Sequence, residues 1–174
     1  VNFNPYWNAP ASIVENDIIP KIQSGTRLLE DMNMRVFQGF GGPEIDPSDV
    51  DWGSAVADDY HFRQEPGPAS AMATAKINFP SPFGIYLHDT PEKHLFKSAQ
   101  RLYSSGCVRV EKVDLLLEWI LNGQEGIGSS EIGAMAETLE RRDVKLEVPP
   151  QLRVTYLTAW PVGNTVAFRS DVYG

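Results

Sequence analysis

The chain has very little cysteine: Cys107 is the only one in 174 residues. A single cysteine cannot form a disulfide within the chain, and it confines any thiol chemistry to one site. Basic residues are also few, because 15 Lys and Arg stand against 23 Asp and Glu, for a formal net charge of −8. That balance argues against nucleic-acid binding, which needs clustered Lys and Arg to neutralise phosphates.

Long hydrophobic runs are absent as well. No stretch approaches 18 consecutive apolar residues, so the sequence predicts no membrane span. No secretory leader is visible, since the chain opens on Val1-Asn2-Phe3 rather than on a basic and then an apolar segment. We interpret the chain as one domain that forms a piece of a longer protein.

Hydrophobic periodicity predicts a mainly β domain with helical decorations, of the α+β class. Strands are expected over residues 1–7, 34–40, 62–64, 84–88, 144–148 and 152–160, and a turn at Gly163-Asn164 should lead into a strand over 165–169. Helices are expected over residues 112–121 and 129–140, with shorter ones after a capping box at Ser12–Glu15 and over 26–33. Pro20 should kink or end the first of these short helices.

Cys107 lies in the segment Ser104-Ser105-Gly106-Cys107-Val108-Arg109, nineteen residues after His88. An imidazole that takes the proton of a thiol makes a strong nucleophile. His88 ends an apolar strand, and a strand end is a common way to present a side chain to a cleft. We therefore interpret Cys107 as a nucleophile and His88 as its general base. The alternative is that Cys107 is a small buried hydrophobe.

Two further histidines compete for the role of base. His61 is interpreted as a surface or structural residue, and His94 as part of a loop or short helix. No pair among the histidines and Cys107 has the spacing of zinc ligands, so the sequence predicts neither a metal site nor another cofactor.

Gly106 and Arg109 flank the cysteine. Gly106 lets the chain turn sharply, so nearby amides could converge on an oxyanion, although a plain tight turn is the alternative. Arg109 leaves an extended segment on the same face as Cys107. It could hold a substrate carboxylate or favour the thiolate. As a structural alternative, it could pair with Glu111 or Asp114.

The His88-to-Arg109 block resembles the L,D-transpeptidase (YkuD-type) family of peptidoglycan-modifying enzymes, in particular its large periplasmic Gram-negative branch. Segments along the whole chain share the likeness: Pro5-Tyr6-Trp7-Asn8, Asp46-Pro47, Val50-Asp51-Trp52, Gln64 with Pro66-Gly67-Pro68, Leu87-His88-Asp89-Thr90-Pro91, Leu95-Phe96, Ser104 to Val110, and Tyr156-Leu157-Thr158-Ala159. Two departures stand out. Ser105 replaces the second His of most of the superfamily, as it does throughout that branch, and Met72-Ala73 replaces the usual Leu-Gly.

The resemblance implies a YkuD-type, β-sandwich-like fold over residues 1–174, with residues 8–65 as a helical capping insert and with N-terminal strands missing. It also implies that Cys107 forms an acyl-enzyme with a tetrapeptide stem, releases D-Ala and makes 3→3 cross-links, and that carbapenems acylate the same thiol. The Asp89 carbonyl would orient the His88 ring, with the Asp89 side chain as the alternative. The oxyanion and substrate-binding residues would be Tyr86, Ser104, Ser105, Gly106 and Arg109.

The same resemblance implies a periplasmic or cell-envelope location, with a membrane anchor outside this chain. Two other functions stay open. Water could replace the acceptor amine, as in an L,D-carboxypeptidase or a cysteine peptidase, or the domain could be a non-catalytic wall-binding module. The insert carries large apolar residues, so we expect it to pack one face on the catalytic core and overhang the cleft as a lid; these residues are Ile18, Ile19, Leu28, Leu29, Phe37, Phe40 and Trp52.

Overall fold

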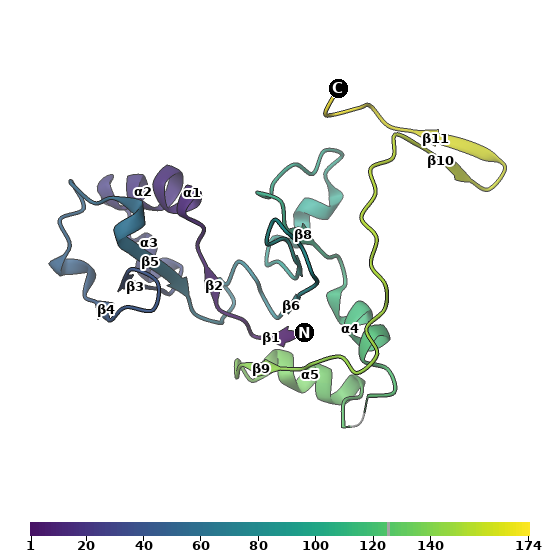
Figure 1. The fold of residues 1–174 in the computed structure, drawn as a ribbon, viewed down its shortest axis with the longest axis horizontal. Helices are drawn as coiled ribbons and strands as arrows, with labels where there is room; N and C mark the ends of the chain where they lie inside the picture. The colour runs from purple at the N-terminus through teal and green to yellow at the C-terminus, as the bar shows by residue number, and fades with distance from the viewer. Residues whose placement is uncertain (125) are drawn as a thin grey trace.

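The computed structural model describes residues 1–124 and 126–174 as two lobes that lie side by side, with a hairpin extending from the second (Figure 1). The strands are β1 (Asn2–Phe3), β2 (Trp7–Asn8), β3 (Met34–Gln38), β4 (Glu44–Ile45), β5 (Tyr60–Gln64), β6 (Ala75–Ile77), β7 (Leu87–His88), β8 (Val108–Arg109), β9 (Arg142–Asp143), β10 (Ala159–Val162) and β11 (Thr165–Phe168). The α-helices are α1 (Ala11–Ile13), α2 (Ile19–Gln23), α3 (Leu28–Asp31), α4 (Val113–Leu121) and α5 (Ser129–Glu137).

The central lobe is built on a mixed sheet in the order β8-β7-β6-β1-β9. Neighbouring strands in this sheet are antiparallel, except for β7 and β8, which are parallel. One face is apolar and packs on α4 and α5, and the buried residues of this core are Phe3, Ala75, Ile77, Val113, Leu117, Leu121, Ile132, Met135 and Val144. Because side chains alternate along a strand, the opposite face is free to carry the polar residues of these strands.

The N-terminal lobe, which runs from β2 to β5, has a second sheet in the order β2-β5-β3-β4 and its own hydrophobic core. Ile18 and Ile19 are buried in that core, and Leu28, Leu29 and Trp52 pack against it. The expectation that these side chains pack on the central lobe is therefore wrong, because the small lobe closes its helices over one face of its own sheet. Phe40, by contrast, is 88% exposed. The two sheets belong to separate cores, so each lobe is built around a sheet of its own. The mixture of sheets and helices fits the expected α+β class.

The first helix continues through Pro20. α1 passes through a π-helical stretch, Val14–Ile18, directly into α2, and Pro20 sits in the first turn of α2. A π-helical turn shifts the hydrogen-bond ladder, which accommodates a residue that has no N–H to donate. The predicted capping box is not formed, because Pro10 is the N-cap and Ser12 lies within the helix. Its carbonyl instead accepts a bond from the Asn16 side chain.

The predicted C-terminal strands are mostly absent. After β9 the described chain runs extended to Thr158 without strand pairing, and regular structure resumes only in the hairpin of β10 and β11. Leu146 packs against the central core, whereas Val148 and Val154 are 87% and 73% exposed. Alternating residues predicted strands here, but alternation creates a strand only where a partner edge is available. The predicted Gly163-Asn164 turn does join the two strands of the hairpin.

The two lobes meet at an aromatic ring held between two arginines. The guanidinium carbons of Arg63, on β5, and Arg141, just before β9, each lie 4.3 Å from the centroid of the Tyr6 ring. Each contact is a cation–π interaction worth about 0.5–1 kcal/mol where exposed. Tyr6 thus links the N-terminal lobe to the central one through side chains as well as through the chain itself.

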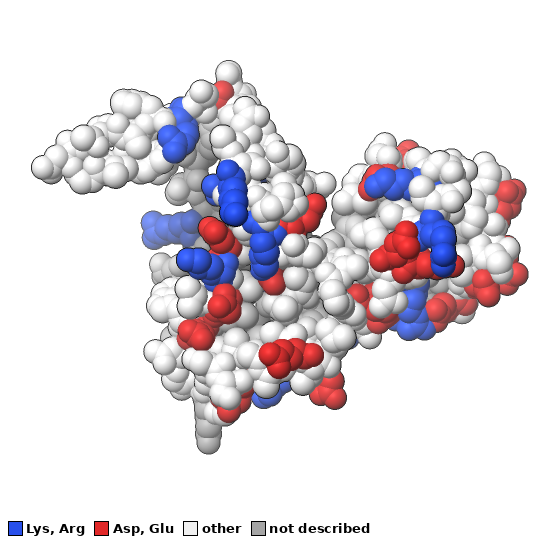
Figure 2. Space-filling view, turned by 180° about the vertical axis from the view of Figure 1, so that it is seen from behind, with Lys and Arg blue, Asp and Glu red and all other residues white. Residues whose placement is uncertain are grey.

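Charge is mixed on the surface drawn in Figure 2. On that face Lys and Arg are interspersed with Asp and Glu, and acidic side chains gather toward the outer edge of the N-terminal lobe. Within the described residues, no helix is long and apolar enough to cross a membrane.

The loop before β6 contains a strained residue at one of the two sequence departures. Ser70 and Met72 are buried, and Ala73 has a φ of +44°, in the left-handed region. A non-glycine residue there costs roughly 1–2 kcal/mol. The Leu-Gly usual in the family places its glycine at this position. A glycine at this position would adopt the same conformation without strain.

Ala73→Gly is expected to raise the free energy of unfolding by about 0.5–1 kcal/mol, because relief of the left-handed strain exceeds the extra chain entropy of glycine. Urea unfolding of the wild type and the variant measures the difference. Ala69→Gly, at an ordinary φ, is the matched control and should lower stability. An Ala73→Gly variant that loses as much stability as this control would contradict the argument.

Candidate active site

Strand register brings the predicted site residues onto the polar face of the central sheet. His88 on β7 lies opposite Lys76 of antiparallel β6 and opposite Arg109 of parallel β8. Tyr86 and Cys107 stand two residues before His88 and Arg109, and so point to the same side of the sheet. Two positive side chains thus flank His88, with Tyr86 and the thiol beside them.

His88 is held in place by the backbone. Its side chain is only 7% exposed, and Nδ1 lies 2.5 Å from the carbonyl oxygen of Asp89. That carbonyl accepts a hydrogen bond from Nδ1–H, so in the neutral ring Nε2 carries the lone pair that can accept a proton. This is the carbonyl contact that the resemblance implies for the ring.

Burial lowers the pKa of His88 from its ordinary 6.5. The hydrogen bond to the Asp89 carbonyl opposes this change, and the positive charge of Arg109 adds to it. The Ala71 backbone also interacts with the ring and raises its pKa. A buried imidazole loses hydration of its charged form, which favours the neutral ring. A neutral imidazole at pH 7 can act as a proton acceptor.

The Asp89 side chain contacts other groups. Its Oδ2 accepts hydrogen bonds from the Thr74 hydroxyl, at 2.8 Å, and from the Thr74 amide, at 3.3 Å. Its Oδ1 pairs with the Lys93 ammonium. The side chain therefore joins β7 to the loop before β6 and to the 3-10 helix Lys93–Lys97, while the carbonyl is the group that contacts His88.

Cys107 is partly buried beside β7. Burial is the main cause that raises the pKa of the Tyr86 hydroxyl, and the Cys107 thiol raises it further through its charge and a hydrogen bond. Within the described residues, no hydrogen bond joins the His88 imidazole to the thiol. Catalytic hydrogen bonds are often loose before substrate binds and tighten in the complex.

Gly106 makes the turn that carries the thiol. Its φ is +126°, and a Cβ built there would meet the Ile85 side chain at 3.7 Å. The Gly106 amide donates to the Ser104 hydroxyl at 3.3 Å, whereas the Cys107 amide donates to no group among the described residues. Of the two amides expected to stabilise an oxyanion, only that of Cys107 is free to do so. Ser104 and Ser105 are exposed at the rim.

Arg109 pairs with Glu92, at 3.1 Å, and not with Glu111 or Asp114 as the structural alternative expected. The chain turns at Glu111 before α4, whereas Glu92 approaches from the loop after β7. Nε of Arg109 is buried and has no hydrogen-bond partner among the described residues.

A cavity of about 420 Å³ opens beside the thiol. Cys107, Gly106 and Arg109 line it together with apolar and aromatic residues, which are Leu95, Phe96, Leu102, Tyr103 and Tyr173. No residue from 8 to 65 lines this cavity, so the N-terminal lobe does not contribute to its wall.

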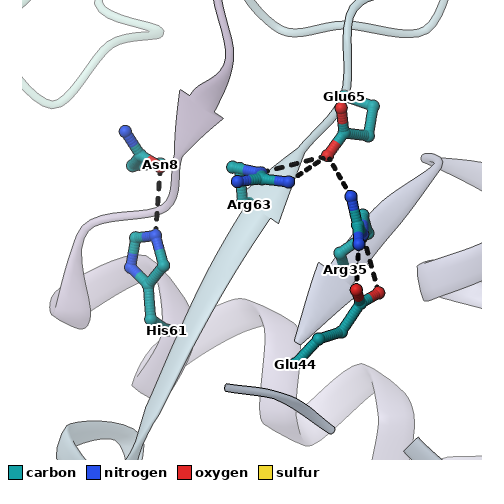
Figure 3. Close-up of polar contacts among 6 residues, drawn as sticks. All are labelled: Asn8, Arg35, Glu44, His61, Arg63 and Glu65. Carbon is teal, nitrogen blue, oxygen red and sulfur yellow. Dashed lines mark hydrogen bonds and ion pairs between the residues drawn. The ribbon is translucent and has the colours of Figure 1, made fainter. Parts of the chain in front are cut away.

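The competing histidines lie elsewhere. His61 is on β5 of the N-terminal lobe, where its Nε2 contacts the Asn8 side chain at 3.0 Å, next to an ion-pair network of Arg63, Glu65 and Arg35 (Figure 3). His94 is exposed on the 3-10 helix after β7. His88 is the histidine that shares a sheet face with Cys107.

Sequence reasoning missed Lys76. Its Nζ lies 4.0 Å from the centroid of the Tyr86 ring, and the charge of Cys107 affects its pKa. Its only sequence signal is its place in a short strand before the His88 strand, because the pairing that brings it opposite His88 is a tertiary property.

The sequence is similar to a known family and to a known protein along the chain. The YkuD family model, described as the L,D-transpeptidase catalytic domain, matches residues 1–132. The chain is 33% identical over 172 residues to a Haemophilus influenzae protein named "Putative L,D-transpeptidase", covering 98% of this chain and 35% of that protein. The chain thus spans about a third of the length of the curated relative that it matches. With the family pattern in the sequence and its His and Cys on one sheet face, the chain belongs to the YkuD family of L,D-transpeptidase catalytic domains.

Proposed function

We propose that this domain is a peptidoglycan L,D-transpeptidase that uses Cys107 as its nucleophile. The observation that carries the proposal is the shared face of β7 and β8, which holds an oriented, buried His88 and the only thiol of the chain beside a cavity. Membership of the family supports the reaction class.

The proposed reaction has two halves. His88 Nε2 takes the thiol proton, and the Cys107 sulfur bonds to the carbonyl carbon of the third stem residue. The negative oxygen is stabilised by the Cys107 amide and by a second donor, which we assign to the Tyr86 hydroxyl because it hydrogen-bonds with Cys107. The carbon–nitrogen bond then breaks, and the departing D-Ala amine takes the proton from His88. In the second half an acceptor amine attacks the thioester, gives its proton to His88, and releases the thiol.

The acceptor, the location and the lid role belong to this proposal. We take the acceptor to be an amine of a neighbouring stem, which yields a 3→3 cross-link, and the place of work to be the periplasm or cell envelope, with an anchor outside this chain. The N-terminal lobe does not line the cavity in the present arrangement. To act as a lid it would therefore have to move, and we place the pivot of this movement at the Tyr6 contact between the lobes.

Hydrolysis is the second candidate function. Exposed residues form the rim of the cavity, so water can enter it and attack the thioester in place of the amine. Water in place of the amine would make the domain an L,D-carboxypeptidase. Mass spectrometry of the products from a tetrapeptide stem, with and without an acceptor amine, separates the two outcomes. Dimeric product supports transfer, while a free tripeptide that is unaffected by the amine would favour hydrolysis.

Exposure to a carbapenem should add one molecule to the wild-type protein and none to Cys107→Ala. The reason is that a β-lactam amide presents an electrophilic carbonyl to the same nucleophile. Intact-mass spectrometry reads the adduct directly. An adduct that persists in Cys107→Ala would overturn the assignment of the nucleophile.

The rate of acylation should fall on the acid side only below about pH 6.5, because burial lowers the pKa of His88 and the neutral ring is the base. His88→Ala should remove this dependence and slow acylation on the order of 10²–10⁴-fold. Stopped-flow acylation between pH 5 and 9 gives both quantities, with His94→Ala as the matched control. Equal rates and profiles in wild type and His88→Ala would show that another group accepts the proton.

A further inference from the structure

Lys76 is a positive side chain in the site whose charge is not neutralised within the described residues. Three cations surround His88: Lys93 pairs with Asp89 and Arg109 pairs with Glu92, but no described carboxylate lies within ion-pair distance of Lys76. Lys76 is also half-buried. Desolvating an ammonium without a partner costs free energy, so such a group is more often paired.

The position of Lys76 is defined from two sides. Pairing of β6 with β7 places it opposite His88, and its Nζ lies 4.0 Å from the centre of the Tyr86 ring. Burial lowers the pKa of Lys76, and the charge of Cys107 opposes that change, so Nζ lies within the range of the thiol's charge. The ammonium therefore lies on the sheet face that carries the thiol, against the ring of Tyr86.

We propose that the Lys76 ammonium binds a carboxylate of the acyl donor next to Cys107, and so makes donor recognition charge-specific. This inference rests on the proposed function. The carboxylate is the C-terminal one of the departing residue, which is three bonds, roughly 3–4 Å, from the carbonyl carbon that the sulfur attacks. A group that binds it must lie on the sheet face of the sulfur, as Lys76 does. Binding there would favour donors that end one residue after the scissile bond.

The chemistry of the neighbours favours this role for Lys76 over Arg109. Arg109 has one nitrogen engaged by Glu92, whereas the Lys76 ammonium contacts the aromatic ring of Tyr86. The other ionisable groups around the thiol are Tyr86 and His88 on β7, Arg109 on β8, and Arg101, Tyr103 and Tyr173 in the cavity wall. None of these is a carboxylate that would compete for the ammonium.

The first test needs no enzyme substrate. Iodoacetate and iodoacetamide alkylate the same thiolate, so the ratio of their rates cancels the thiolate fraction and reports attraction of a carboxylate to the sulfur. At low ionic strength Lys76→Met should lower this ratio about threefold or more, and Lys76→Arg should keep it. Lys145→Met removes the same net charge outside β6, β7 and β8 and should leave the ratio unchanged. An unchanged ratio in Lys76→Met would overturn the carboxylate site.

The second test uses the proposed reaction. A tetrapeptide donor with a free C-terminal carboxylate should exceed its C-terminal amide in kcat/KM on the order of 10- to 100-fold in the wild type, and Lys76→Met should abolish most of that preference. Lys76→Arg should restore part of it. A preference that persists in Lys76→Met overturns the role of Lys76 alone. A wild type that is inactive on both donors, with an alkylation ratio that still depends on Lys76, would instead overturn the proposed function and leave the carboxylate site standing.

Discussion

The pairing of β7 between β6 and β8 is the constraint on which the site depends. It fixes Lys76, His88 and Arg109 in one row, and by alternation it places Tyr86 and Cys107 on the same face. The opposite face of these strands contributes to the core that α4 and α5 cover. A shift of one residue in this register would turn the reactive side chains into that core and the apolar ones out to solvent. Packing of the core therefore also enforces the arrangement of the site.

Burial and backbone hydrogen bonding act together on the histidine. The Asp89 carbonyl fixes the tautomer and orientation of the ring, while desolvation keeps the ring neutral at pH 7. The Asp89 carboxylate serves a different purpose, since it joins the Thr74 loop to Lys93. One residue thus orients the base through its main chain and ties the surrounding loops together through its side chain. The charge of the Asp89 carboxylate also acts to raise the pKa of His88, but burial outweighs it and the pKa is lowered.

Much of the local structure was predictable, and the failures have physical causes. The helix over residues 112–121 and the hairpin at Gly163-Asn164 follow from strong local signals, an apolar stripe and a turn dipeptide. Residues 144–148 and 152–158 alternate as well, yet they lack a partner edge and do not pair. The helix around Pro20 persists because a π-helical stretch absorbs the missing donor. The apolar residues of the N-terminal lobe form their own core. The number of apolar side chains in the sequence is the same whether they pack in such a core or on the central lobe, so it could not distinguish the two arrangements.

The sequence by itself determined the family, the candidate nucleophile and the candidate base. The single cysteine, the strand-ending histidine and the residues between them form one continuous segment, so they can be recognised without the fold. Tertiary structure alone decided that the Asp89 carbonyl contacts the ring, that Arg109 pairs with Glu92, and that Lys76 lies against the Tyr86 ring. The physical reason is that these contacts join separate strands and loops. Their geometry is set by register and burial, which a short motif does not encode.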